Sequence, residues 1–454
     1  MNKIKKNLTK QNICNDISIV IQGPLSINSI NNVAENCKIW KNILPNSEII
    51  LSISHTDDFE LVDGINLKSK NDGIINNNSI KIINNICNHI IISPQTESLP
   101  EIKRDSTGKN NINYQIKSSF LGLKKAKNNY ALKIRSDMVF KNTDFIDFYL
   151  DNYLINRGKR KCLQHRVLIP SMYTLNPFSK ERMPFHFSDW FQFGTTNDLK
   201  TIWSIDYFSL NDAIFYRNNS YVKNSNNLEK LFLTRIAVEQ YISYSLAKKF
   251  FPDLQLEYHN DTTSIVDSIE FLIDNFIVMN STSNGIFFPK YRKEIIDYNN
   301  IKKCISYEEW LFMSKNRDEN FKNFLMRNDE VFYIIFGPND LFCKESVILN
   351  KNIVNSSMNG VLSYGPYFDI ENGLYFCDVL FDKIYGFGYL TIKITANFGK
   401  KLISKKMFFV FGKKNRNKIT FPFLIEKRLE NSVEIVIGYK FFKKISLSRI
   451  IIHN

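Results

Sequence analysis

Two buried-strand patterns on either side of one helical pattern, near the amino terminus, constrain the fold more than any other feature. Residues 16–22 and 48–53 are short apolar runs, and Gly23-Pro24 ends the first. Between them, the apolar side chains of residues 28–44 recur at helical spacing. A strand, a helix and a second strand in this order form a βαβ unit with parallel strands and a right-handed crossover. The sequence therefore predicts an α/β domain.

Further patterns extend this domain along the chain. Three more strands are predicted, at residues 89–92, 130–134 and 275–280. Three more helices are predicted, at residues 111–127, 144–153 and 228–249. Residues 57–78 are polar and rich in Gly and Asn, so we expect them to be irregular. Residues 93–109 are expected to form a long loop, and such loops are usually functional or disordered.

The pattern changes beyond a polar, charged stretch near residues 316–330. Residues 389–396 and 432–437 alternate between apolar and other side chains, and glycines recur at hairpin-like spacing with no helical pattern between them. These features predict an all-β sandwich of the jelly-roll type. We therefore expect four segments: a basic tail at 1–15, a mixed-sheet α/β domain at 16–315, a linker at 316–330 and an accessory β-sandwich at 331–454.

The chain of 454 residues carries a net charge of +15, which predicts an anionic partner. Nucleic acid, a lipid headgroup surface and a phosphorylated substrate all fit that charge. The sequence has no RNP signature, zinc finger or helix-turn-helix pattern, so we expect no nucleic-acid partner. An anionic membrane surface or a phosphorylated substrate is the expected partner.

Cysteine usage and hydropathy bear on the compartment. The seven cysteines are odd in number, lie far apart and form no CxxC motif, which predicts a reducing compartment. No signal-peptide pattern occurs at the amino terminus, and no apolar run approaches the roughly 18 residues of a membrane-spanning helix. We expect a cytoplasmic protein, held by charge at the inner face of the inner membrane if it works there.

A charged pair follows the strand at residues 130–134. Ligands of open α/β sheets bind at the carboxyl ends of the strands, and this strand ends in Arg135-Ser136-Asp137. Arg135 and Asp137 are two residues apart, so they face the same side. The pair could serve a phosphate, a metal or a sugar. A salt bridge that closes the strand is the alternative, and these residues alone leave both open.

Three other stretches carry candidate site residues. Asn113 and Gln115 lie at a helix start, which suits phosphate binding, although ordinary Asn capping is commoner. His186, Asp189 and Trp190 lie among aromatic residues, an arrangement typical of sugar recognition; a buried aromatic cluster is the alternative that these residues alone favour.

Glu239 lies in an apolar helical context. Burial would raise the pKa of its carboxyl group and suit it to act as a general base. An exposed position on the helix is the alternative.

Five stretches in order resemble the WavE lipopolysaccharide-synthesis family over residues of about 15–300: residues 19–24, 48–52, 113–115, 132–137 and 238–241. The resemblance implies a glycosyltransferase of the GT-A type that acts in bacterial surface-polysaccharide assembly. It implies that Asp137 matches the last acidic position of the DxD motif and Glu239 the acceptor-side carboxylate. The first acidic position holds Arg135, which can neutralise a phosphate itself, so Mg²⁺ or Mn²⁺ on Asp137 is one option and no metal the other.

The resemblance implies transfer of a sugar from a nucleotide-activated donor to a lipid-linked or oligosaccharide acceptor of lipopolysaccharide or capsule. The expected donor-binding residues are Gln22, Gly23, Pro24, Asn113, Gln115, Arg135 and Asp137. On the acceptor side we expect His186 and Trp190, with Glu239 or, second, Asp189 as the catalytic base, and Lys290 or Arg292 at the leaving group. Two alternatives remain: a transferase of a non-sugar group onto a capsular sugar, and a non-catalytic glycan-binding protein.

Overall fold

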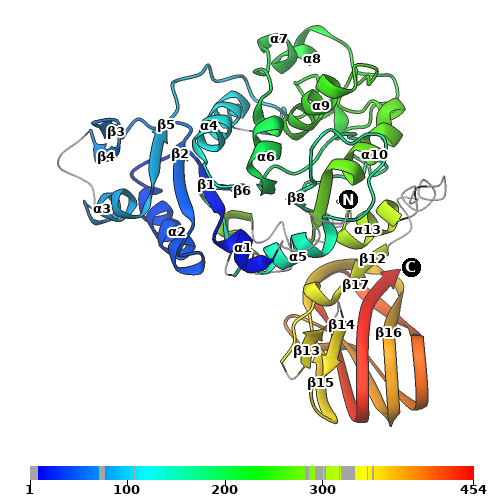
Figure 1. Cartoon of the computed structure of the whole chain (residues 1–454). Coiled ribbons are helices and arrows are strands. Elements are labelled where there is room, and N and C mark those ends of the chain that lie inside the picture. Colours follow the sequence, from blue (N-terminus) through cyan, green and yellow to red (C-terminus); the bar gives the residue numbers. More distant parts are fainter. Residues whose placement is uncertain are drawn as a thin grey trace. The chain divides into compact units, whose positions relative to one another are not determined.

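The computed structural model describes most of the chain as two compact units (Figure 1). The residues it describes are 9–70, 77–106, 108–140, 142–281, 286–291, 300, 303–315, 317, 333–344, 346–349 and 352–453. The first unit comprises Met1–Met279, Gly285–Lys290 and Glu309–Met326, and the second Asn280–Asn284, Tyr291–Glu308 and Arg327–Asn454. The predicted linker, residues 316–330, lies outside the described residues except for Arg317.

A seven-stranded mixed sheet forms the centre of the first unit, in the order β10-β8-β9-β6-β1-β2-β5. Its strands are β1 (Ile17–Gly23), β2 (Glu48–Ile53), β5 (His89–Ile92), β6 (Tyr130–Arg135), β8 (Val167–Pro170), β9 (Phe191–Thr195) and β10 (Phe276–Met279). β9 runs antiparallel to β6 and β8, and the other neighbours are parallel. Since β2 and β6 flank β1 on opposite sides, the direction of winding reverses between β1 and β6, and ligands bind at such reversal points.

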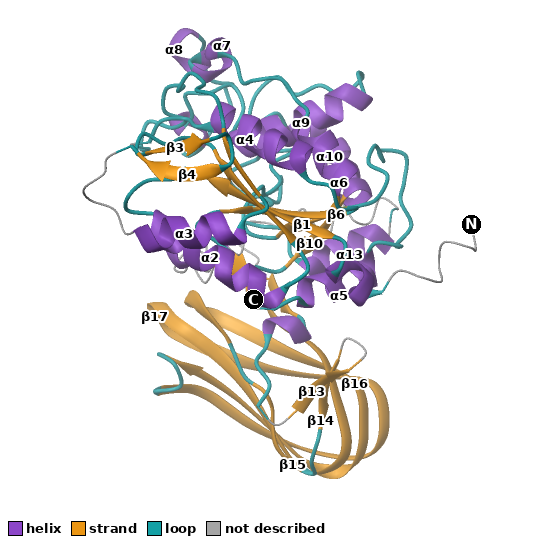
Figure 2. Ribbon diagram, turned by 60° about the vertical axis from the view of Figure 1, so that its left-hand side comes forward, coloured by secondary structure: helices purple, strands orange, loops and turns teal. Residues whose placement is uncertain are grey.

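Helices cover both faces of this sheet (Figure 2). The described helices are α1 (Lys10–Cys14), α2 (Ile30–Ile43), α3 (Asn77–Ile86), α4 (Ile112–Lys125), α5 (Asp144–Asn152), α6 (Thr196–Trp203), α7 (Leu210–Ala213), α8 (Phe215–Asn218), α9 (Val238–Phe250), α10 (Ile265–Asn275) and α13 (Tyr307–Lys315). α4 packs on β1 and β2, with α6 beside it and α9 against α6. The predicted βαβ unit is confirmed as β1, α2 and β2.

Two local predictions are wrong at the amino-terminal side. The expected tail contains the short helix α1, whose Ile13 is fully buried. The stretch at residues 57–78, expected to be irregular, contains the antiparallel hairpin β3 (Phe59–Val62) and β4 (Asn66–Ser69), and α3 begins at its end. Phe59 and Leu67 bury their side chains, which stabilises the hairpin despite its polar sequence.

The helix predicted at residues 228–249 is also wrong in its first half, since α9 begins only at Val238. A single 3₁₀ turn, Glu229–Leu231, precedes it. Between them the backbone finds partners in other segments: the Leu233 amide donates to the Ile102 carbonyl (2.8 Å) and the Arg235 amide to the Asp212 carbonyl (2.8 Å). Apolar side chains at helical spacing are therefore buried here without a helix, and Glu239 lies in the first turn of α9.

The second unit is a large antiparallel β structure, which confirms the predicted all-β content. Its strands are β12 (Tyr333–Phe336), β13 (Ser346–Leu349), β14 (Asn352–Asn355), β15 (Asn359–Ser363), β16 (Pro366–Ala396) and β17 (Lys401–His453). Residues 401–434 of β17 pair antiparallel with residues 366–396 of β16, and residues 434–453 pair antiparallel with residues 376–395. Ile392, Ile394, Ile435 and Ile437 are fully buried, whereas their neighbours Thr391, Lys393 and Val436 are exposed or partly exposed. The jelly-roll form of this unit stays a prediction.

An acidic pair in the second unit predicts a pH-dependent stability. The Asn280 side-chain amide donates to Glu308 Oε2 (3.0 Å) and to Asp340 Oδ2 (2.9 Å). Burial and the Asp340 charge raise the pKa of Glu308 to about 8, and Arg449 opposes this rise. The folded protein therefore holds a proton that the unfolded chain releases near its ordinary value of 4.5. The stabilising effect is complete below that value and is lost as the pH rises to about 8.

We therefore expect the second unit to become less stable as the pH rises from about 5 to about 8.5. Its thermal midpoint should decrease, and its free energy of unfolding should decrease by up to about 1.4 kcal/mol per pH unit. Glu308→Gln carries no titrating proton and should flatten this dependence, whereas Glu426→Gln, at an exposed position, should not. Circular dichroism melts at several pH values measure this. A slope that is identical in Glu308→Gln and in the unsubstituted chain would contradict the prediction.

Candidate active site

The carboxyl ends of β1 and β6 lie side by side at the reversal point of the sheet. Gln22 and Arg135 are register partners, and the Ser136 amide donates to the Gln22 carbonyl (2.8 Å). The Asn36 side chain donates to the Ser136 carbonyl (2.5 Å), which fixes the turn after β6 from the side of α2. These contacts hold the charged pair that follows β6 against the Gly23-Pro24 turn.

Gly23 permits this close approach. A Cβ atom at Gly23 would overlap Ser136 Oγ and lie 3.0 Å from Ser136 Cβ. We expect Gly23→Ala to lower the free energy of unfolding by about 1–3 kcal/mol, because two packed strand ends must separate. Chemical denaturation measures the change. Gly108→Ala, which meets nothing within 4 Å, should stay within about 0.5 kcal/mol, and Ser136→Gly should restore stability to Gly23→Ala. Equal effects of the two alanine substitutions would argue against a steric role.

Arg135 and Asp137 form a bidentate pair. Arg135 Nε donates to Asp137 Oδ1 (3.0 Å) and Nη2 to Oδ2 (2.9 Å). The Asp137 side chain keeps 37% of its surface exposed, so the pair is open to a ligand from one side. The guanidinium also lies 5.2 Å from the ring centroid of Phe288. The structure thus contains the salt bridge considered from the sequence, and its partial exposure also leaves it able to bind an anion or a sugar hydroxyl.

An aromatic row begins at this pair and consists of Phe288, Trp190 and Tyr173. The Arg135 amide donates to the Trp190 carbonyl (3.3 Å). The Trp190 ring meets the edge of Phe288 with 4.5 Å between centroids and lies 5.1 Å from Tyr173. Trp190 is buried, so most of its surface contacts protein. The buried aromatic cluster favoured from the sequence is confirmed here, and a sugar would reach only part of this row.

His186 and Glu239 meet at the far side of the same row. His186 Nδ1 lies 2.9 Å from the Tyr173 carbonyl oxygen, and since a carbonyl only accepts, Nδ1 carries the hydrogen. Nε2 then faces Glu239 Oε2 at 3.5 Å, and the two groups form an ion pair when the imidazole carries a second proton. His186 is buried, whereas 25% of the Glu239 side chain is exposed. The couple therefore presents its carboxylate side to solvent.

Gln240 holds His186 and Glu239 close to each other. Its Oε1 accepts a hydrogen bond from the Ala237 amide (3.0 Å), which caps the start of α9. Its Nε2 donates to the Pro184 carbonyl (2.7 Å) and to the His259 carbonyl (2.8 Å). Pro184 lies two residues before His186, so the buried Gln240 amide connects the first turn of α9 to the segment that carries His186. The positive end of the helix dipole favours a charged Glu239 in this turn.

Asp189 lies in a buried polar network. The Gln115 side-chain amide donates to the Asp189 carboxylate, and Lys133 Nζ donates to the Asp189 carbonyl (2.8 Å). Burial lowers the pKa of Lys133 to about 8, against the opposing charge of Asp189. The ammonium lies 4.5 Å from the ring centroid of Trp203. Because Asp189 is buried and held in this way, it is less accessible to an acceptor hydroxyl than Glu239.

Sequence reasoning missed Lys133, although a lysine inside an otherwise apolar strand run is a signal of a buried charge. It also missed His55, at the carboxyl end of β2. The His55 carbonyl accepts from the Leu25 amide (3.0 Å), and its exposed ring lies 5.5 Å from that of Tyr114. The His55 backbone therefore lies beside the Gly23-Pro24 turn, next to the predicted donor site.

Two predicted donor-binding side chains are occupied by interior contacts. Gln22 Nε2 donates to Ser118 Oγ (2.9 Å). Asn113 exchanges two hydrogen bonds with the Phe208 backbone (2.7 and 3.1 Å). Both side chains are buried, so they position α4 against β1 and against the segment after α6. Pro24 and Lys290 are exposed, and Arg292 lies outside the described residues.

Asp137 is the residue at which a divalent metal ion could bind. In the part of the chain that the structure describes, no three or more His, Cys, Asp or Glu residues are grouped to hold a metal ion. Both oxygens of Asp137 accept hydrogen bonds from Arg135. A divalent ion at this position would have to displace the guanidinium and complete its shell with donor phosphates and water. The residues therefore fit a dedicated metal site poorly.

Among the described residues, no helix is both long enough and apolar enough to cross a bilayer.

Comparisons with known proteins were made for the whole chain. The family model described as WavE lipopolysaccharide synthesis matches residues 90–333, more than half of the chain. No curated protein matches the chain significantly. Among solved structures, an active-site mutant of LgtC is 8% identical, with 68% of this chain and 84% of that chain covered and a TM-score of 0.28.

Two carbohydrate-binding modules are also similar in part. One, from Cellvibrio mixtus lichenase 5A in complex with cellotriose, is 10% identical, with 26% of this chain and 89% of that chain covered and a TM-score of 0.19. The other, BiXyn10A CBM1, is 14% identical, with 23% and 74% covered and a TM-score of 0.17. All three scores are below 0.5, so we draw no argument from these likenesses.

Proposed function

The chain belongs to the WavE lipopolysaccharide synthesis family, and from this membership we propose that it is a glycosyltransferase. It transfers a sugar from a nucleotide-activated donor to a growing bacterial surface polysaccharide, lipopolysaccharide or capsule. The observation that carries the proposal is the placement of two polar pairs, Arg135–Asp137 and His186–Glu239, at the two ends of one aromatic row. The reversal of strand order between β1 and β6, and the single antiparallel strand β9, support a GT-A-like assignment for the first unit.

The donor is proposed to bind where β1 and β6 end. The Gly23-Pro24 turn and the half-open Arg135–Asp137 pair border this place, and the exposed His55 ring lies on the same edge of the sheet. Arg135 can neutralise a donor phosphate by bidentate hydrogen bonding. Asp137 then keeps the guanidinium in position or accepts a hydrogen bond from the sugar. Lys290 or Arg292 is proposed to stabilise the departing diphosphate.

The acceptor is proposed to bind at the other end of the row. Glu239, partly exposed, removes the proton from the acceptor hydroxyl as the bond to the donor sugar forms. His186, with Nε2 3.5 Å from the Glu239 carboxylate, is proposed to hold that carboxylate in place, and the Tyr173 carbonyl orients the imidazole. Asp189, buried beside Gln115 and Lys133, is proposed to support the local structure, with its catalytic role as the second choice.

The test is a donor screen. The purified chain is incubated with nucleotide sugars and with lipopolysaccharide or capsule fragments, and release of the nucleoside diphosphate and mass of the product are measured. A glycosylated product supports the proposal. Transfer of a non-sugar group would favour the first alternative, and glycan binding without donor turnover would favour a non-catalytic binding protein. Either result would overturn the assignment as a glycosyltransferase.

Metal dependence and membrane association are proposed with it. Because Arg135 occupies both oxygens of Asp137, donor turnover is expected to persist in excess EDTA; complete loss that Mg²⁺ or Mn²⁺ restores would contradict this.

The net charge of +15 is proposed to hold the protein to anionic membrane surfaces that carry a lipid-linked acceptor. Cosedimentation with anionic vesicles should fall as salt rises, and no pelleting at low salt would contradict this second point.

A further inference from the structure

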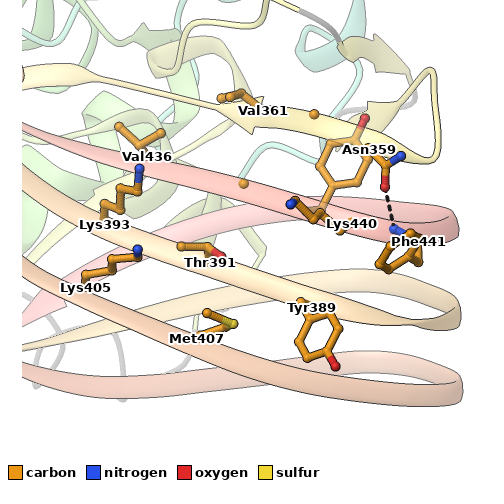
Figure 3. Close-up of a pocket in the computed structure, with 13 residues that line it drawn as sticks. Asn359, Val361, Tyr389, Thr391, Lys393, Lys405, Met407, Val436, Lys440 and Phe441 are labelled. Atoms are coloured by element: carbon orange, nitrogen blue, oxygen red, sulfur yellow. Dashed lines mark hydrogen bonds between the residues drawn. The ribbon is translucent and has the colours of Figure 1, made fainter.

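A groove on the outer face of the second unit has the chemistry of a binding site. It has a volume of about 630 Å³, within the range of small-molecule and oligosaccharide sites. Residues of β15, β16 and β17 line it (Figure 3). Along β16 the residues that line it alternate with Leu390, Ile392 and Ile394, which are fully buried in the core on the opposite face. The groove thus belongs to a face that the core does not need.

One end of the groove is positively charged. Lys393 on β16 and Lys405 on β17 are direct register partners and line this end, and Lys440 lines the groove farther along. Like charges directly opposite each other destabilise a sheet. None of the three ammonium groups forms an ion pair with a residue that the structure describes, and none of the described lining residues is acidic. The fold therefore holds uncompensated positive charge here, and an anion would relieve the repulsion.

The other end is aromatic. Tyr389 and Phe441 line the groove, and Phe409 is the register partner of Tyr389 with 5.2 Å between ring centroids. All three rings are exposed, Phe409 to 58%. Between the two ends lie the Thr391 hydroxyl and Gly438, register partners of each other. Exposed rings give flat faces for the CH groups of a sugar, and the hydroxyl and lysines can serve its polar groups.

We propose that this groove binds an acidic oligosaccharide, a chain whose sugars carry carboxylate or phosphate groups. The lysines pair with the anionic substituents and the rings stack on the sugar faces. A groove with lysines at one end, a hydroxyl between and exposed rings at the other end suits a narrow chain that carries anionic groups and sugar faces along its length. The proposal depends only on the second unit and does not require the transferase assignment.

Gly438 offers a sharp test. A Cβ there would have its nearest neighbours at 3.8 Å, an ordinary contact distance, so a larger side chain fills the groove without strain in the sheet. We expect the full chain to bind tetragalacturonate in calorimetry and to bind neutral maltotetraose much more weakly. Gly438→Leu should abolish binding, and Lys393→Gln with Lys405→Gln should weaken it by about tenfold or more. Lys443→Gln with Lys444→Gln, an equal charge change outside the lining, should leave it within about twofold.

Thermal melts show whether each variant is folded. If Gly438→Leu is unfolded, the difference in tetragalacturonate binding between the two double lysine variants tests the proposal. Equal loss in both lysine pairs, or wild-type binding by Gly438→Leu, would overturn the proposal. A third result would also overturn it: binding to vesicles of phosphatidylcholine with about one third phosphatidylglycerol that requires Lys393 and Lys405, while tetragalacturonate does not bind. The groove would then bind a membrane surface. Asp137→Asn should bind tetragalacturonate normally, which separates this result from failure of the proposed transferase.

Discussion

Asp137→Asn is expected to lower transferase kcat/KM by about a thousandfold while leaving the fold intact. The carboxylate accepts two hydrogen bonds from Arg135, and an amide in its place offers one acceptor and turns an NH₂ group toward the guanidinium. Loss of one hydrogen-bond donor positioned at a transition-state oxyanion typically costs a factor of about 10²–10³, and Asp137 holds the proposed donor, Arg135, in position. Here the loss also frees the guanidinium that we propose binds the donor phosphate.

The fold should survive because 37% of the Asp137 side chain is exposed, so water can solvate an unpaired Arg135. Asp253→Asn is the matched control: Asp253 also pairs with an arginine, Arg160 Nη1 at 3.0 Å, and is 65% exposed. We expect it to keep full activity. Donor turnover and thermal midpoints of the two variants are compared. Near wild-type turnover by Asp137→Asn would remove this residue from the active site.

Five strands of the sheet, β1, β2, β5, β6 and β10, and the place of the Arg135–Asp137 pair at the end of β6 could be predicted from the sequence, whereas β8 and β9 were missed. Strands β1, β2 and β6 are short apolar runs bounded by turn residues, so their burial and their ends can be read locally. The carboxyl end of β6 could be proposed as a ligand-binding edge because ligands of open α/β sheets bind there, but the reversal between β1 and β6 depends on the strand order, which only the structure gives. Arg135 and Asp137 are neighbours in sequence, so alternation alone placed them on one side.

The rest depends on contacts between distant segments. Leu233 and Arg235 satisfy their backbone amides on the Ile102 and Asp212 carbonyls, and no local pattern distinguishes that from a helix. The meeting of His186 with Glu239 likewise requires Gln240 to bind the Pro184 carbonyl. The sequence could propose each residue separately, but only the fold brings them into one couple.

Glu239→Gln is expected to lower kcat by about a thousandfold with little change in KM, because general-base catalysis contributes about 10²–10⁴ and the side chain is placed to act on the acceptor only as its proton leaves. The amide keeps the shape of the carboxylate but cannot take up a proton.

Two variants make the assignment specific. His186→Gln removes the partner of Glu239 without removing the base, so we expect a smaller loss of kcat, of about tenfold, as for a positioning residue. Glu257→Gln changes an exposed glutamate and should leave kcat unchanged. Steady-state kinetics would measure all three. Should Glu239→Gln keep its turnover and Asp189→Asn lose it, the base would be Asp189, and the network of Gln115 and Lys133 would then hold the catalytic carboxylate.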